Sequence, residues 1–215
     1  MTHDAVRNNY NRLSPFYDLF TGSESRFSEK GLQMLEVCEG EKVLEIGFGS
    51  GKGLISLAHS TGESGKVYGI DLSEGMLQAA RKKVSIADLS TRIEIQQGDA
   101  LALPYRKGTF HALFMSFSLE LFNLVEIPIV LGECRRVLQD GGRLGVTALA
   151  DGNRLATKIY KWFHLNIPAV FDCQPINLCE AIDTAGFAEI RYCEGSLFGL
   201  TVGMITARKD SIGNN

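Results

Sequence analysis

The sequence predicts an α/β fold with a doubly wound, mostly parallel seven-stranded sheet, helices on both faces and an antiparallel hairpin at the C-terminal end. Three observations predict it. Short β-rich runs alternate with amphipathic stretches of helical length, most runs end at Gly, Asp or Ser, and the last two runs follow each other with no helix between them. Strands joined through helices lie parallel, whereas two strands joined by a short turn must be antiparallel.

The elements are expected in the following places. Parallel strands coincide with short β-rich runs, at 42–46, 67–70, 93–97, 111–115 and 143–149. Amphipathic patterns predict helices over 74–87 and 127–140. A further helix over 177–185 ends at Gly186, a residue typical of helix C-caps. The antiparallel strands that complete the sheet are 188–194 and 200–208.

The chain of 215 residues is expected to form a single domain, 1–215, with two segments outside the α/β core. The first, 1–38, is aromatic and helical in pattern, and we expect it to form an N-terminal cap. The second, 151–174, interrupts the alternation between the fifth strand and its helix. Because ligands of open α/β sheets bind beyond the carboxyl ends of the strands, this second segment is a candidate substrate lid.

Composition and charge argue against several classes of partner. The net charge is −3 and no block of Lys or Arg is present, which argues against nucleic acid. The five cysteines are scattered without a C-x-x-C pair. We therefore expect reduced thiols, and we expect no metal site. No apolar run reaches the length of about 18 residues that a membrane span requires, whereas peripheral membrane contact stays open. We therefore expect a cytoplasmic protein, with the oligomeric state open.

The densest cluster of glycines lies in the stretch EKVLEIGFGSGKG, residues 41–53. Its spacing does not fit a dinucleotide fingerprint, because the positions that require a third glycine hold Lys52 and Leu54. It does not fit a P-loop either, which would place glycine at Ile46 and a hydroxyl at Gly53. We therefore expect the loop to hold a ligand other than a dinucleotide or a nucleoside triphosphate.

The pattern that remains is an acidic residue followed by alternate glycines, beginning at Glu45. Asp71 stands twenty residues after Gly51, at the end of the second expected strand, where a carboxylate can accept hydrogen bonds from a ribose diol. The alternative for Asp71 is a helix N-cap. Asp99 and Ala100 end the third strand, where a side-chain acceptor and a backbone N–H suit the edge of an adenine. Together these positions predict a site for a nucleoside.

With these motifs the chain resembles the class I S-adenosylmethionine-dependent methyltransferases. The resemblance is carried by VLEIGFGSG, YGIDLSEGMLQAARKK, QGDALALPY and RRVLQDGGRL. It implies that the loop glycines line the methionine part of the cofactor, that Glu45 lies near the amino group, and that Leu72 packs against the base. The full set of implied cofactor residues is Tyr17, Glu45, Gly47, Phe48, Gly49, Gly51, Asp71, Leu72, Asp99, Ala100 and Ser116.

Within this class the chain is similar to the ubiquinone/menaquinone biosynthesis methyltransferases. LSPFYD, which includes Tyr17, and FHALFMSFSLELFN, which includes Ser116, carry this similarity. Ser118 and Glu120 depart from the group, which has glycine and arginine there, and we expect both to face the acceptor pocket. The similarity implies a small-molecule acceptor that is apolar or quinone-like.

Methyl transfer needs two aligned reactants in a dry site, and some acceptors also need a base. His164, within the aromatic run of the expected lid, is the candidate catalytic base, and the alternative is an ordinary residue of an amphipathic helix. His111 begins the fourth strand, far from the site, and is expected to be structural. A second hypothesis is an S-adenosylmethionine-binding protein without catalysis, acting as a sensor or assembly factor.

Overall fold

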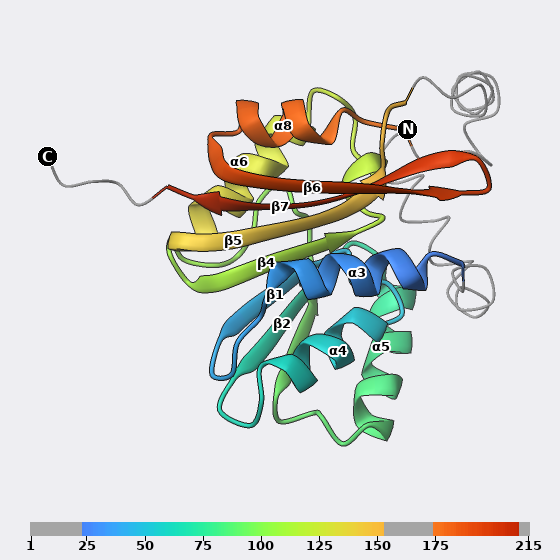
Figure 1. Ribbon diagram of the computed structural model, residues 1–215. Helices are drawn as coiled ribbons and strands as arrows, with labels where there is room; N and C mark the ends of the chain where they lie inside the picture. The colour runs from blue at the N-terminus through green and yellow to red at the C-terminus, as the bar shows by residue number, and fades with distance from the viewer. Residues whose placement is uncertain (1–22, 153–173, 211–215) are drawn as a thin grey trace, which may run out of the picture.

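The computed structural model describes residues 23–152 and 174–210. Across these residues the strands form one seven-stranded sheet in the order β3-β2-β1-β4-β5-β7-β6 (Figure 1). The strands are β1 (Lys42–Ile46), β2 (Lys66–Asp71), β3 (Ile93–Gln97), β4 (Phe110–Ser116), β5 (Leu138–Leu149), β6 (Phe187–Leu197) and β7 (Leu200–Lys209). The first five are parallel, and β7 is antiparallel to both of its neighbours. The predicted sheet with its terminal antiparallel hairpin is confirmed.

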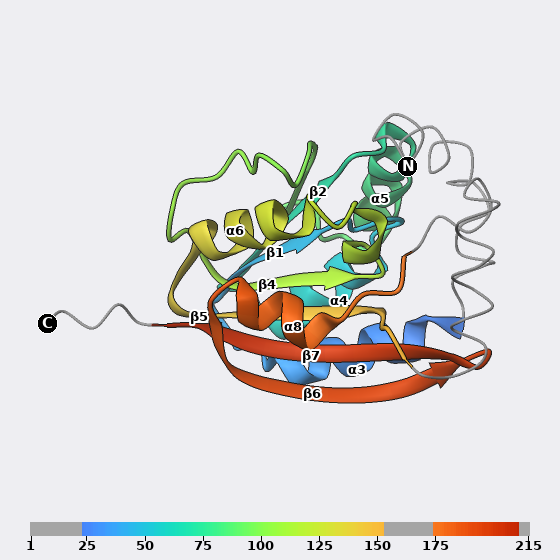
Figure 2. The same cartoon turned by 90° about the horizontal axis from the view of Figure 1, so that it is seen from above.

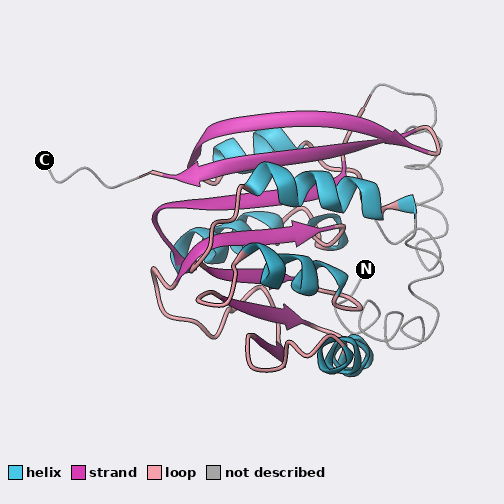
Figure 3. Cartoon of the chain, turned by 60° about the horizontal axis from the view of Figure 1, so that its bottom comes forward, coloured by secondary structure: helices cyan, strands magenta, loops and turns pink. Residues whose placement is uncertain are grey.

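Helices cover both faces of the sheet, as predicted (Figures 2 and 3). One face carries α3 (Ser25–Leu35), α4 (Lys52–Ser60) and α5 (Glu74–Ile86), and the other carries α6 (Ile127–Val137) and α8 (Leu178–Thr184). Alternation along β1 explains the two layers, because Val43 is buried with α4 and α5 while Leu44 is buried with α6 and α8. Strand residues therefore face two separate cores.

One boundary differs from the expectation. The helix predicted over 127–140 ends at Val137, and Leu138 already belongs to β5, five residues before the expected start at Arg143. Leu138 is fully buried and pairs with Phe110, and the register then shifts before it resumes at Arg143. Gly141 has φ 74°, which a glycine adopts without strain. Periodicity did not reveal this irregular start, because a fully buried leucine suits a helix as well as a strand.

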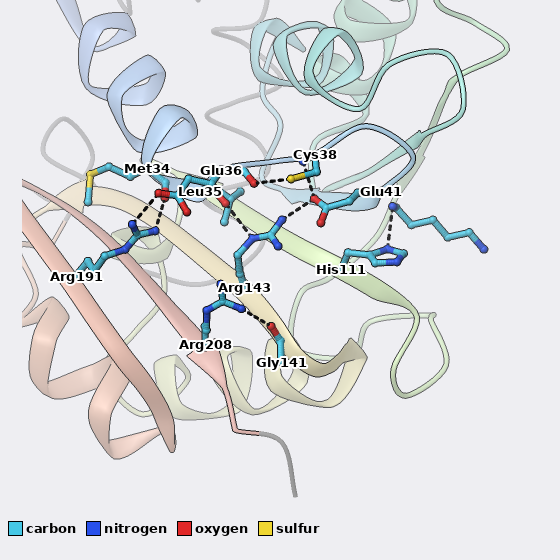
Figure 4. Close-up of polar contacts among 11 residues, drawn as sticks. Met34, Leu35, Glu36, Cys38, Glu41, His111, Gly141, Arg143, Arg191 and Arg208 are labelled. Atoms are coloured by element: carbon cyan, nitrogen blue, oxygen red, sulfur yellow. Dashed lines mark hydrogen bonds and ion pairs between the residues drawn. The ribbon is translucent and has the colours of Figure 1, made fainter.

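Helix α3 lies close to the sheet and is held at its C-terminal end by arginines (Figure 4). A Cβ on Gly31 would clash with Thr147 of β5, so the absence of a side chain permits the close approach. Arg143 donates to the Leu35 carbonyl at 3.0 Å, and Arg191 donates to the Met34 carbonyl at 2.9 Å. Because the last carbonyls of a helix have no partners within it, these contacts both cap α3 and fix it to the sheet.

The remaining expectations fall differently. His111 accepts a hydrogen bond from the Lys42 N–H at 3.0 Å, which confirms its structural role at the start of β4 (Figure 4). Helix α3 lies within the expected cap 1–38, whose residues 1–22 are outside the described residues. Of the candidate lid 151–174, residues 153–173 are also outside them. The cap and the lid stay predictions.

Candidate functional site

The site lies where the chain changes direction across the sheet. From β1 the chain moves outward to β2 and β3, then returns to the other side of β1 as β4. The loops after β1 and β4 therefore diverge at the carboxyl edge, which is where open α/β sheets bind ligands. The glycine-rich stretch 47–51 is the first of these two loops.

The loop after β1 needs its glycines for its own conformation. Gly47, Gly49 and Gly51 have φ values of 72°, 51° and 88°. A Cβ on Gly47 would lie 2.5 Å from the Ser118 Cβ, and one on Gly51 would lie 2.9 Å from the Ala80 Cβ. Gly51 is the N-cap of α4, as expected for a glycine that opens the helix. The predicted tight turn is confirmed. The protein's own packing therefore excludes side chains at Gly47 and Gly51, whether or not a ligand is bound.

Asp71 joins this loop to the end of β2. Its Oδ2 accepts the Gly49 N–H at 2.9 Å and its Oδ1 accepts the Ser73 N–H at 2.9 Å. Burial raises the pKa of Asp71 to about 6, against the lowering effect of these two hydrogen bonds. The N-cap of α5 is Ser73, whose Oγ accepts the Met76 N–H at 3.1 Å. The N-cap alternative for Asp71 is therefore wrong.

Glu45, the second-last residue of β1, carries a buried carboxyl group. It is 3% exposed, and its Oε2 has no hydrogen-bond partner among the described residues. Burial, and secondarily the charge of Asp71, raise the pKa of Glu45 well above its usual value. Its Oε1 occupies the space that a Cβ on Gly53 would fill. A cation beside Glu45 would satisfy the buried oxygen and favour the ionised form.

A cavity opens between the glycine-rich loop and α3. Among the predicted cofactor residues it is lined by Glu45, Gly47, Phe48, Gly49 and Ser116. The same lining does not include Gly51, Asp71, Leu72, Asp99 or Ala100. The structure thus brings together Glu45, Gly47 and Gly49 of the positions assigned to the methionine part of the cofactor, whereas Gly51 and the positions assigned to the nucleoside are not among the lining residues.

The α3 side of the cavity was not found from the sequence. It contributes Ser25, Ser28 and Glu29, and the Oγ atoms of Ser28 and Ser116 lie 2.6 Å apart. No motif marks these residues, because only the docking of α3 on the sheet brings them to β4. Phe117, which also lines the cavity, has φ 49°, a conformation that costs a non-glycine residue about 1 kcal/mol or more.

The ends of β2 and β3 are linked on the nucleoside side. The Gly98 N–H donates to the Asp71 carbonyl at 2.9 Å, and the Gln97 side chain donates to the Leu72 carbonyl at 3.0 Å. Asp99 accepts the Leu101 N–H at 2.9 Å through Oδ1. Leu72 and the Asp99 turn therefore lie side by side, as a shared nucleoside site requires.

Comparison with known proteins finds a methyltransferase domain and methyltransferase relatives. A family model described as a methyltransferase domain matches residues 43–142. The chain is 33% identical over 146 residues to the demethylmenaquinone methyltransferase of Lactobacillus johnsonii, a match over 66% of this chain and 59% of that protein. It is 28% identical over 220 residues to the 2-phytyl-1,4-naphtoquinone methyltransferase of Thermosynechococcus vestitus, over 90% of this chain and 96% of that protein. The chain thus carries a methyltransferase domain, which confirms the predicted resemblance to the S-adenosylmethionine-dependent methyltransferases.

Solved structures share the fold of this chain. An S-adenosylmethionine-dependent methyltransferase from Aquifex aeolicus is 24% identical, with a TM-score of 0.62 over 85% of this chain and 89% of that one. The [4+2]-cyclase SpnF is 18% identical, with a TM-score of 0.78 over 98% of this chain and 97% of that one. At these identities the structures establish the fold alone, and a cyclase among them shows that the fold serves more than one reaction.

Ser118 and Glu120, both expected to face the acceptor pocket, are buried in the described part of the chain and bind the backbone. Ser118 is 6% exposed and donates to the Ile46 carbonyl at 3.1 Å. Glu120 is 1% exposed, and its Oε1 accepts the Leu149 N–H at 3.0 Å. Both side chains bind the backbone at the ends of the two strands that flank β4, and neither lines the cavity described above.

The other site predictions divide as follows. Phe48 lines the cavity, and its ring also packs in the core, where it fills the space beside Gly69. Tyr17 and His164 lie outside the described residues. No group of three potential metal ligands occurs within 23–152 and 174–210. Over the same ranges no helix has the length and apolar character needed to cross a membrane.

Proposed function

We propose that the protein transfers a methyl group from S-adenosylmethionine to a small apolar acceptor of the quinone class. The observation that carries the proposal is the match to the 2-phytyl-1,4-naphtoquinone methyltransferase, which extends over nearly the whole length of both proteins. The demethylmenaquinone methyltransferases match over a shorter part, and the chain spans 59% of the length of the one from Lactobacillus johnsonii. The inward direction of Ser118 and Glu120 removes the main sequence feature that opposed a quinone acceptor.

The residues at the carboxyl edge fit S-adenosylmethionine. The buried Glu45 oxygen without a described partner suits the amino group of the methionine part. A carboxylate offers about four acceptor positions, and Asp71 uses one on each oxygen for backbone N–H groups, so it retains capacity for two ribose hydroxyls. We assign the adenine to Asp99 and Ala100, and the face of the base to Leu72.

The bound cofactor would supply a methyl group on a positively charged sulfur. The protein contributes mainly alignment and exclusion of water, since displacement at a methyl carbon requires both reactants in line. Gly47 and Gly49 of the loop and Ser116 of β4 line the cavity, together with Ser25, Ser28 and Glu29 of α3. His164 stays the proposed base, which a ring carbon or phenol acceptor would use.

The experiment supplies the protein with S-adenosylmethionine and a panel of demethylated naphthoquinols, phenols and amines. The expected result is S-adenosylhomocysteine together with a quinol product that is one methyl group heavier by mass spectrometry. Binding of the cofactor without turnover on any acceptor would contradict the proposal and favour the second hypothesis, binding without catalysis. Turnover on amines alone would contradict the quinone class.

The role of His164 has a separate test. In His164→Ala, kcat is expected to fall by about a hundredfold or more while the Kd for S-adenosylhomocysteine stays unchanged, because a general base acts on the acceptor. An unchanged kcat would return His164 to an ordinary helix residue.

A further inference from the structure

The loop that follows β3 is held by two charged residues of α6, on the far side of the loop from the glycine-rich stretch. Glu133 and Arg136 lie one turn apart on α6. Arg136 Nε lies 2.6 Å from Glu133 Oε1, and Arg136 Nη2 lies 2.7 Å from Glu133 Oε2. This two-point pairing fixes the plane of the guanidinium group against the carboxylate.

The pair binds the backbone of the loop through both partners. The Leu103 N–H donates to Glu133 Oε2 at 2.8 Å, and Arg136 Nη2 donates to the Leu103 carbonyl at 2.8 Å. Arg136 Nη1 donates to the Tyr105 carbonyl at 2.7 Å. Both polar groups of the Leu103 backbone are thus bound to side chains, in the way that a neighbouring strand would bind them. The Leu103 side chain is itself 4% exposed and packs in the core.

A short turn transmits this anchor to the residues assigned to adenine. Asp99 accepts the Leu101 N–H through its side chain and the Ala102 N–H, at 3.2 Å, through its carbonyl. Ala100 is 6% exposed and packs in the same core cluster as Leu103. The turn is therefore fixed at one end by Asp71, through Gly98, and at the other end by the α6 pair. A shift at Leu103 would displace Asp99, because only three residues separate them.

We infer that Glu133 and Arg136 are positioning residues for base recognition, which hold Asp99 and Ala100 in the one arrangement that selects adenine. The inference rests on the cofactor site proposed above. Neither residue is needed as a ligand contact, since the effect passes through the loop backbone. A partly exposed ion pair adds little to the stability of a fold, so loss of the pair affects base selection more than folding.

The test measures binding of two probes that differ only in the base. S-adenosylhomocysteine carries adenine, whereas S-inosylhomocysteine carries hypoxanthine. Hypoxanthine presents an oxygen in place of the amino group from which Asp99 would accept a hydrogen bond. The wild-type protein is expected to prefer the adenine probe by at least about tenfold, because a site built to bind a polar group rejects the analogue that lacks it. Calorimetry gives both Kd values without any methyl transfer.

The variants are Arg136→Lys and Glu133→Gln, which remove the two-point pairing and keep similar side-chain size. Each is expected to weaken S-adenosylhomocysteine binding by about tenfold and to bring the two Kd values close together. The matched control is Arg135→Lys, because Arg135 is the next residue of α6 and donates to the Gly186 carbonyl at 3.2 Å, at the start of β6. The control is expected to keep both the affinity and the adenine preference of the wild type.

The outcomes separate this inference from the site on which it rests. A wild-type protein that binds both probes equally would contradict the adenine assignment itself. A preference that persists in Arg136→Lys and Glu133→Gln would overturn the positioning role and leave the site intact. Thermal unfolding identifies the remaining case. If both variants fail to fold, the pair holds the fold rather than the base loop, and the inference is again overturned.

Discussion

The loops after β1 and β4 are alike in sequence character and opposite in use. Both follow buried parallel strands at the same edge, both contain a serine, and each has a glutamate close by, Glu45 near the end of β1 and Glu120 within the loop after β4. At the first loop, Glu45 and Gly47 line the cavity. After β4, Ser118 and Glu120 turn inward and bind the backbone at Ile46 and Leu149. Polar residues beyond a strand thus identify a binding edge, and tertiary hydrogen bonds decide which of them remain available to a ligand.

The largest expected effect is on cofactor binding, through Asp71, which ends β2 and binds the loop after β1. Asp71→Ala removes the acceptor of the Gly49 N–H and the proposed acceptor of the ribose hydroxyls. Binding of S-adenosylhomocysteine is expected to weaken by about a hundredfold, measured by calorimetry, because buried donors are left without partners. Unchanged affinity would remove Asp71 from the cofactor site and with it the contrast between the loops.

A second prediction joins the two loops directly. Gly47→Ala places a methyl group against the Ser118 Cβ and forces a side chain into a backbone with φ 72°. The expected loss of unfolding free energy is about 2 kcal/mol. Adding Ser118→Gly makes room for the methyl group, so the double variant should recover about 1 kcal/mol relative to additivity in a denaturant cycle. Strict additivity would show that the two loops do not pack against each other.

The second loop should affect stability and leave binding unchanged. Glu120→Ala leaves the buried Leu149 N–H without its side-chain acceptor, which should cost about 1–3 kcal/mol of unfolding free energy. The Kd for S-adenosylhomocysteine should stay within about twofold of the wild type, since Glu120 does not line the cavity. Glu120→Gln is the matched control, because its amide oxygen still accepts that N–H. Weakened binding in a stably folded Glu120→Ala would contradict the inward role.

The smallest expected effect is a pH dependence of cofactor affinity, set by Asp71 beside the first loop. Burial raises the pKa of Asp71 to about 6, so the carboxylate that would accept ribose hydroxyls is ionised above this pH and protonated below it. Affinity for S-adenosylhomocysteine should be constant from neutral pH upward and fall by about tenfold for each pH unit below the pKa. Asp71→Asn should flatten the profile between pH 5 and 7, at a lower overall affinity. A profile of the same shape in that variant would assign the titration to another group.

The sequence was most informative where a local requirement is visible in residue type. Short-range geometry predicted the turn at the alternate glycines, which have positive φ. It also drew attention to the acidic residue before them and to Asp71 at the end of the next strand. Two kinds of feature needed the tertiary structure. Ser28 reaches Ser116 only because α3 docks on the sheet, and the early start of β5 depends on the pairing of Leu138 with Phe110. The inward direction of Ser118 also depends on a distant carbonyl, which no pattern within the loop reveals.

The central claim is that the first loop, with Glu45 and Asp71, forms the cofactor site. A crystal structure of the protein with S-adenosylhomocysteine tests this claim most directly. The account predicts the ribose hydroxyls within hydrogen-bond distance of Asp71, the amino group beside Glu45 in the cavity under α3, and Ser118 still bonded to the Ile46 carbonyl. A ligand bound away from Glu45 and Asp71, or one contacted by Ser118 and Glu120, would contradict it.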